Sequence, residues 1–174
     1  MKVEVRAAVR EDAARIADVN VAAWRAGYAH LLPDDMLYAD EFDETRRALW
    51  SMWRFAPGQR VAVAVSGSDE RVVGFGTYGP ERERPHAPGG RGEILAFYFH
   101  PLVWGTGAAD ALFDHVELRL RTEGFESAVL WVLQDNPRAR RFYERHGWST
   151  TGDTTRVTIE GTTLPEVEYH RQLA

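Results

Sequence analysis

The sequence is constrained most by a strand, a glycine loop and a helix that follow one another over residues 93–121. Residues 93–99 have the pattern of a strand with apolar side chains at odd and even positions alike, which is typical of a strand covered on both faces of a sheet. Pro101 ends the strand because it lacks an N–H, and Gly105 and Gly107 allow the backbone to turn with positive φ. We therefore expect a central strand that leads directly into a tight loop.

An amphipathic helix is predicted after this loop. Its apolar positions are Ala109, Leu112, Phe113, Val116 and Leu120, and Gly124 ends it. The first N–H groups of a helix have no partner within the helix and lie at the positive end of its dipole, so they attract phosphate. A glycine turn before a helix also has a purely structural role in many α/β proteins, and that interpretation stays open.

Two common phosphate-binding motifs are excluded at this loop. The dinucleotide fingerprint requires a third glycine at the position that Asp110 occupies, and a carboxylate there would repel a pyrophosphate. The nucleotide-triphosphate loop requires Gly-Lys-Ser/Thr, which does not occur in the sequence. A pyrophosphate cradle of another kind remains.

Composition excludes several classes of function. The 174 residues carry a net charge of −5, so nucleic acid is not an expected partner. No cysteine occurs, which excludes disulfides and thiolate nucleophiles, and the six histidines show no metal-ligand spacing, so no metal is expected. No apolar signal core or membrane-spanning run is found. We expect a cytoplasmic protein, not bound to a membrane, and a single lysine among many arginines suggests a GC-rich bacterial genome.

The rest of the chain predicts one domain over residues 1–174, with no repeat and no linker. Predicted strands lie at 3–6, 60–66, 71–78, 127–133, 156–159 and in the last ten residues, and predicted helices at about 11–27, 43–55 and 137–146. The strand at 127–133 is expected to run parallel to 93–99 across the intervening helix.

In the second predicted helix, Leu49, Met52 and Trp53 are expected to face inward. Residues 79–92 read as a surface loop that either closes over a ligand or only connects two strands.

Aromatic residues gather near the first two predicted helices. Trp24, Tyr28, Trp50 and Trp53 are large rings that bury much area, so core packing is one interpretation. The other interpretation is that Trp24 and Tyr28 line the mouth of a substrate site.

Two motifs resemble the GNAT superfamily of acyl-CoA N-acyltransferases, and the resemblance in element order covers nearly the whole chain. The family's loop reads Gln/Arg-x-x-Gly-x-Gly/Ala, and residues 104–109 (Trp-Gly-Thr-Gly-Ala-Ala) match it from Gly107 to Ala109. Trp104 departs from it, because the family has a polar or cationic residue there. The second motif, Asn-x-x-Ala-x-x-Phe-Tyr-x-x-x-Gly-Phe, is similar to residues 136–148, which end in Gly-Trp.

The resemblance implies a GNAT-type α/β (α+β) fold. Its sheet would be mixed and largely antiparallel, with about six to seven strands, a central splayed parallel pair and about four helices. It also implies acetyl-CoA as co-substrate and an amine as acceptor. The implied cofactor-binding residues are Phe97, Tyr98, Phe99, Trp104, Gly105, Thr106, Gly107, Ala108, Ala109, Asp110, Asn136, Arg140 and Tyr143. Asn136 is equally explained as a helix cap, and Arg140 as part of a solvated helix face.

By family position Tyr143 is the general acid that protonates the departing thiolate. Its place in an apolar stripe with Ala139 and Phe142 also fits a core residue. Glu93 is the candidate general base, since it begins the central strand with the same parity as Phe97 and Phe99. A glutamate at the surface end of a strand is the other interpretation.

The sequence thus predicts an N-acetyltransferase that transfers acetyl directly to a primary amine in a ternary complex, because no cysteine exists to carry the acetyl group. A small cationic amine is favoured by the acidic charge and by Trp24 and Tyr28, while peptide amines remain open. The alternatives are a non-catalytic acyl-CoA-binding module and a structural dimerisation module. A homodimer is common in the family.

Overall fold

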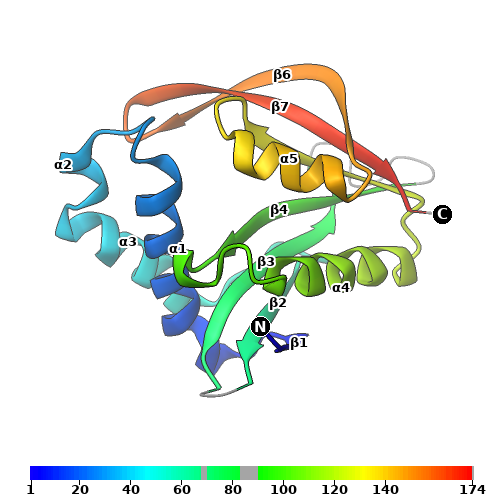
Figure 1. Cartoon of the computed structure of the whole chain (residues 1–174), viewed down its shortest axis with the longest axis horizontal. Helices are drawn as coiled ribbons and strands as arrows, with labels where there is room; N and C mark the ends of the chain where they lie inside the picture. Colours follow the sequence, from blue (N-terminus) through cyan, green and yellow to red (C-terminus); the bar gives the residue numbers. More distant parts are fainter. Residues whose placement is uncertain (68–69, 83–89, 174) are drawn as a thin grey trace. The chain divides into compact units, whose positions relative to one another are not determined.

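A computed structural model describes residues 1–67, 70–82 and 90–173. Within these residues seven strands are hydrogen-bonded in the order β1-β2-β3-β4-β5-β7-β6 (Figure 1). The strands are β1 (Val3–Ala7), β2 (Arg60–Ser66), β3 (Val72–Pro80), β4 (Arg91–Phe99), β5 (Ser127–Leu133), β6 (Ser149–Ile159) and β7 (Thr162–Gln172). The helices are α1 (Ala13–Tyr28), α2 (Asp34–Leu37), α3 (Asp40–Met52), α4 (Ala108–Thr122) and α5 (Pro137–Arg145), with 3₁₀ turns η1 (Arg10–Asp12) and η2 (Pro101–Val103).

Strands β4 and β5 are the parallel pair that the sequence predicted, with Arg91 opposite Ser127 and Ile94 opposite Leu130. The pairs β1–β2, β2–β3, β5–β7 and β6–β7 are antiparallel. A parallel pair needs a long crossover, and α4 supplies it. The predicted fold class, a mixed and largely antiparallel sheet with a central parallel pair, is confirmed.

Contacts between residues group the chain into two compact units. The first unit comprises residues 1–78 and 96–119, and the second comprises residues 79–95 and 120–174. The chain therefore passes between the units three times, after residues 78, 95 and 119. Both β4 and α4 contribute residues to both units.

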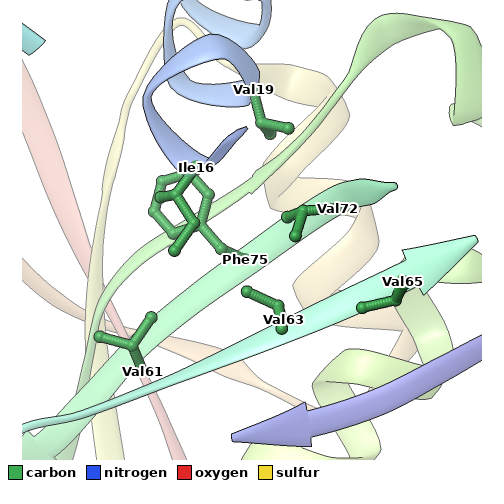
Figure 2. Close-up of a cluster of buried hydrophobic side chains, with 7 residues drawn as sticks. All are labelled: Ile16, Val19, Val61, Val63, Val65, Val72 and Phe75. Atoms are coloured by element: carbon green, nitrogen blue, oxygen red, sulfur yellow. The ribbon is translucent and has the colours of Figure 1, made fainter. Parts of the chain in front are cut away.

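The core of the first unit lies between α1 and the β2–β3 hairpin (Figure 2). Ile16 and Val19 of α1 meet a set of buried strand residues, which are Val61, Val63, Val65, Val72 and Phe75. The valines of β2 alternate with alanines, so one side of the strand faces α1. Helix α3 packs beside α1, and its Trp50 adds to this core.

The other side of this hairpin packs against the beginning of α4. The rings of Phe97 in β4 and Phe113 in α4 meet edge to face, with centroids 5.2 Å apart. A Cβ on Gly76 would lie 3.2 Å from Phe97, and a Cβ on Gly74 would lie 2.3 Å from the ring of Phe99. Only glycine therefore fits at position 74, because the Phe99 ring takes the space of a side chain.

In the second unit, α5 packs on one side of β7. The hydroxyl of Tyr169 in β7 accepts a hydrogen bond from Arg140 (3.1 Å) and donates one to Glu144 (2.7 Å), both on α5. Arg171, two residues further along β7, donates to the carbonyl of His146 just after that helix. Because side chains alternate along a strand, Glu166 and Glu168 point to the opposite side of β7.

Helix α3 corrects one prediction. It begins at Asp40, earlier than expected, and Leu49 and Met52 are 60% and 50% exposed instead of facing inward. The inward stripe of α3 is Phe42, Arg46 and Trp50, spaced by four residues. The prediction was wrong because an arginine in the middle of that stripe concealed it.

Other predicted boundaries shift as well, most at β6, which begins at Ser149 although the strand was predicted at 156–159. The strand at 127–133 and the first strand of the hairpin are found where the sequence placed them, whereas the short α2 was not predicted. The loop predicted at 79–92 is shorter, since β3 continues to Pro80 and β4 begins at Arg91. Residues 83–89 of that loop lie outside the described residues. No helix in the described ranges combines the length and apolarity that a membrane crossing requires.

Candidate active site

The loop before α4 turns at two glycines, and the first residue of the helix, Ala108, is buried. Gly105 and Gly107 adopt positive φ values of 76° and 82°, and both are exposed. Among the described residues, no hydrogen-bond partner is found for the N–H groups of Gly105, Gly107, Ala108 and Ala109. Unpartnered N–H groups at the positive end of a helix dipole form a site for an anion. The loop predicted to cradle a phosphate thus lies in the first unit, and the described residues leave these donors without a partner.

Trp104, the residue that departs from the family motif, closes the loop. Its indole N–H donates to the carbonyl of Phe99 over 2.9 Å. The hydroxyl of Thr106 donates to the carbonyl of Val103 over 2.7 Å, and the N–H of Thr106 bonds the same carbonyl. The side chains of Trp104 and Thr106 therefore donate to carbonyls of the loop and its flanking strand. Backbone N–H groups are the donors that this loop could offer to a phosphate.

Asp110 puts a negative charge in the first turn of α4. Its Oδ2 lies 3.9 Å from the position that a Cβ on Gly107 would take. A carboxylate there favours the helix through its dipole but opposes a bound phosphate. An anion at this loop would therefore be attracted by the positive end of the helix dipole and repelled by the Asp110 carboxylate.

The aromatic residues of β4 divide between two sides of the first unit. Phe97 packs on Phe99, with centroids 5.4 Å apart, on the side of α4. Tyr98 packs on Phe75 and on Trp24, with centroids 5.7 and 6.4 Å apart, on the side of α1. The three residues predicted to contact the cofactor thus do not share a face.

Trp24 and Tyr28 belong to an aromatic cluster on α1, α3 and β4. The two rings meet edge to face at 5.0 Å, and Phe42 lies 5.8 Å from Trp24. The guanidinium of Arg46 lies over the rings of Trp24 and Phe42, 4.7 and 3.7 Å from their centroids. The sequence predicted Trp24 and Tyr28 as a possible surface for a cation, but a cation of the protein already stacks on this cluster.

Helix α5 carries the second motif, in the second unit. Asn136 is its N-cap, since Oδ1 accepts the N–H of Ala139 over 3.1 Å, and Pro137 follows at the first position. Tyr143 is 8% exposed, and its ring lies 5.6 Å from Phe142 and 6.3 Å from Tyr169. Asn136 therefore has the capping role that the sequence indicated, and Tyr143 is packed against the sheet.

Arg140 is engaged by the protein. Its Nε donates to the Tyr169 hydroxyl, and its Nη1 donates to the carbonyl of Gln134 over 3.1 Å. The hydrogen bond to Tyr169 is the main cause that raises the pKa of Arg140. This side chain ties α5 to β5 and β7.

Glu93 is buried, with 3% of its surface exposed, in contrast to a glutamate at the surface end of a strand. Arg82 donates to Oε2 from its backbone N–H (2.9 Å) and to both carboxylate oxygens from its guanidinium (2.6–3.1 Å). The guanidinium side of this pair is 60% exposed. Both oxygens of the candidate base are thus occupied by one arginine near the surface.

The expected shared parity of Glu93 with Phe97 is not observed. Gly92 faces Leu120, since a Cβ on it would lie 2.8 Å from that side chain, so the adjacent Glu93 points away from α4. Phe97, in contrast, packs on α4 through Phe113. The alternation of β4 is therefore interrupted between these positions, which sequence parity alone did not reveal.

Further buried acids lie near Glu93 in the second unit. Arg91 pairs with Glu81 and lies 3.6 Å from Glu168, and both of these glutamates are buried. Burial raises the pKa of Glu166, partly opposed by the charge of Arg82. No group of His, Asp and Glu that would hold a metal is found in the part of the chain that the structure describes.

The candidate residues fall into the two units. The loop 104–110, the β4 aromatics 97–99, Trp24 and Tyr28 lie in the first, while Glu93, Asn136, Arg140 and Tyr143 lie in the second. Sequence reasoning missed Arg46 and Arg82. The spacing of four residues between Phe42 and Arg46 on one helix was a signal for the first, since such residues share a face.

Comparisons with known proteins agree on one family. The model of the GNAT acetyltransferase family matches residues 19–148. The chain is 32% identical over 167 residues to the N-acetyltransferase YuaI of Bacillus subtilis (strain 168), itself uncharacterized, and the match covers 95% of this chain and 90% of YuaI.

Solved structures share the fold. PaiA N-acetyltransferase from Thermoplasma acidophilum, in complex with coenzyme A, has a TM-score of 0.70 at 18% identity and covers 99% of both chains. YncA from Salmonella typhimurium, with its cofactor acetyl-CoA, has a TM-score of 0.69 at 18% identity and covers 100% of this chain and 95% of its own. With its family motifs, its parallel β4–β5 pair and these matches, the chain belongs to the GNAT family of acetyltransferases.

Proposed function

We propose that this protein transfers the acetyl group of acetyl-CoA to a primary amine by direct attack in a ternary complex. The observation that carries the proposal is the set of unpartnered N–H groups at the beginning of α4, the position at which the family motif places the pyrophosphate. Family membership and neighbours solved with coenzyme A or acetyl-CoA support it.

The donors of the cradle suit a diphosphate. Gly105 and Gly107 are exposed and Ala109 is partly exposed, whereas Ala108 is buried, and the absence of large side chains allows phosphate oxygens to approach the backbone of the loop. Bound there, acetyl-CoA supplies a thioester whose carbonyl carbon accepts the amine and whose sulfur leaves as a thiolate. We propose that the Nδ2 group of Asn136 donates to the pantetheine arm while its Oδ1 caps α5.

Tyr143 is proposed as the general acid. As the new C–N bond forms and the C–S bond breaks, its hydroxyl gives a proton to the thiolate, and the amine loses a proton to a base. The largely apolar packing of this ring against Phe142 and Tyr169 keeps it oriented.

Glu93 is proposed as the general base, acting directly or through water. Since Arg82 occupies both of its oxygens, Glu93 must lose at least one of these hydrogen bonds to take a proton. The guanidinium end of this pair is 60% exposed and can turn to water, but the Glu93 carboxylate is 3% exposed, so it loses a charge-assisted hydrogen bond when Arg82 does so. A Glu93→Gln variant is expected to lower kcat/KM because an amide takes no proton, whereas Arg82→Gln, which leaves the carboxylate in place, is expected to lower it less.

The test of the proposal is acetyl transfer to a panel of amines, amino acids, polyamines, aminoglycosides and peptides, measured as release of free thiol from acetyl-CoA. Binding of acetyl-CoA is measured in parallel by calorimetry. Thiol release that depends on an amine confirms the proposal. Binding without release for any amine supports a non-catalytic acyl-CoA module, and absence of binding supports a structural module.

A further inference from the structure

The loop before α4 is tied to the residues that lead into β1. The nitrogen of Met1 donates to the carbonyl oxygen of Thr106 over 2.8 Å, across 105 residues of sequence. Both residues lie in the first unit. No other donor to this carbonyl is found among the described residues. Met1 lies two residues before Val3, which pairs with Ser66 of β2, so the donor is anchored to the sheet.

This hydrogen bond determines the direction of a donor in the loop. The carbonyl of Thr106 and the N–H of Gly107 belong to one peptide unit, which is planar and trans, so they point in opposite directions. A carbonyl held by Met1 on one side therefore directs the Gly107 N–H to the other side. That N–H is one of the donors for which no partner is found among the described residues.

The loop's own hydrogen bonds hold the peptide units on either side of this one. The N–H of Thr106 donates to the carbonyl of Val103 over 3.3 Å, and the carbonyl of Gly107 accepts from the N–H of Ala111 over 3.4 Å. The unit between them turns over by rotation about ψ of Thr106 and φ of Gly107, and glycine allows both signs of φ. Among the described residues, Met1 is thus the group that selects the observed orientation.

The orientation of this peptide unit matters to an anion. If the unit turned over, the Thr106 carbonyl oxygen would take the direction that the Gly107 N–H now has. A phosphate attracted by the positive end of the α4 dipole would then meet a partial negative charge in place of a donor. A donor that is oriented before the phosphate arrives also avoids the cost of ordering the loop on binding.

We propose that Met1 is a positioning residue for cofactor binding: its nitrogen fixes the peptide unit 106–107, so that the Gly107 N–H is oriented in advance for the diphosphate of acetyl-CoA. This inference rests on the proposed function and adds a residue that the family motif does not contain. The contact requires one N–H on the nitrogen of Met1 and does not involve its side chain. A nitrogen without an N–H loses the contact.

The test compares proteins in which one added glycine precedes position 1, so that the nitrogen of residue 1 forms a peptide bond. With methionine at position 1 the nitrogen keeps an N–H, whereas Met1→Pro removes it, because proline has none. Met1→Ala behind the same glycine is the matched control, since it removes the side chain and keeps the N–H. Met1 is exposed, so these changes leave the core intact.

Binding of coenzyme A is measured by calorimetry. The glycine-extended protein and its Met1→Ala variant should bind within about 2-fold of wild type, and Met1→Pro should raise the Kd by about 3- to 10-fold, as expected for one hydrogen bond. Equal Kd values in the three extended proteins would overturn the inference and leave the proposed function standing. Absence of coenzyme A binding by the wild-type protein would overturn both.

A second readout needs no ligand. The residual dipolar coupling of the Gly107 N–H, measured in the free ¹⁵N-labelled protein in an aligned medium, reports the direction of that bond. The coupling should change in the Met1→Pro protein and stay the same in the Met1→Ala protein, with similar unfolding midpoints for the two. A coupling that Met1→Pro leaves unchanged overturns the inference, because Met1 then does not orient the peptide unit.

Discussion

Helices α4 and α5 begin in opposite ways: one start leaves backbone N–H groups without a partner among the described residues, and the other is capped by a side chain. At α4, two glycines with positive φ precede the helix, and N–H groups at 105 and 107–109 have no partner among the described residues. At α5, Pro137 has no N–H to satisfy, and Asn136 caps the N–H of Ala139. The two ends have the same dipole, so the difference lies in which donors the protein itself already uses.

The two helices also differ in the kind of chemical group that they offer. The α4 end offers backbone donors, which hold charge but transfer no proton. Helix α5 offers a side chain, Tyr143, that can give one. We therefore expect changes at α4 to weaken cofactor binding and changes on α5 to affect turnover or stability, and four variants test this division.

The largest effect is expected for Tyr143→Phe. Loss of the proton donor should lower kcat by about 100-fold or more, while the Kd for acetyl-CoA, measured by calorimetry, stays within about 2-fold. The matched control is Tyr169→Phe, which removes a buried hydroxyl that bonds Arg140 and Glu144. This control should lower the unfolding midpoint and spare kcat. Similar kcat values for Tyr143→Phe and wild type would remove Tyr143 from the chemistry.

Gly107→Ala should come next, with a rise of about 10-fold in the Kd for acetyl-CoA. Alanine is strained at a φ of 82°, and relief of the strain turns the loop N–H groups away from a common point. Gly124→Ala is the control, since Gly124 has a φ of 93° after the other end of α4 and open space around it. Both variants should lose similar stability. If both also lose similar affinity, the cradle assignment fails.

Asn136→Ala is expected to lower the free energy of unfolding by about 1 kcal/mol, because the capped N–H of Ala139 loses its acceptor. Urea unfolding measures this loss. The Kd for acetyl-CoA decides whether the amide also contacts the cofactor. An increase that Asn136→Ser, which restores a cap, does not abolish would assign Nδ2 to the cofactor. Unchanged affinity would leave Asn136 as a cap alone.

The smallest effect is expected for Asp110→Asn. Removing the carboxylate beside the cradle should tighten acetyl-CoA binding by about 2- to 5-fold at low salt, because like-charge repulsion is removed. The gain should shrink as salt is added. Weaker binding in this variant would show that Asp110 supports the loop more than it repels the phosphate.

The sequence predicted much of the fold because its local signals are strong. Pro137 after Asn136 and glycine before α4 specify helix ends through φ values and capping, which depend on a few neighbouring residues. The strand at 127–133 was placed correctly from its continuous apolar run. The family resemblance then supplied the mixed, largely antiparallel sheet, which no local pattern specifies.

Prediction failed where a side chain's environment comes from distant residues. Leu49 and Met52 are apolar, yet α3 turns Arg46 inward because the rings of Trp24 and Phe42 stabilise a stacked guanidinium. Glu93 was placed by parity alone, but its direction depends on the interruption of β4.

The sequence by itself therefore determined the strand–loop–helix segment, the capped start of α5 and the family, because these follow from backbone preferences and short motifs. Only the tertiary structure decided that Arg82 hydrogen-bonds both carboxylate oxygens of Glu93 and that Arg46 stacks on Trp24, whose indole N–H has no partner among the described residues. Those pairs join residues on different elements, and their geometry exists only once the elements pack.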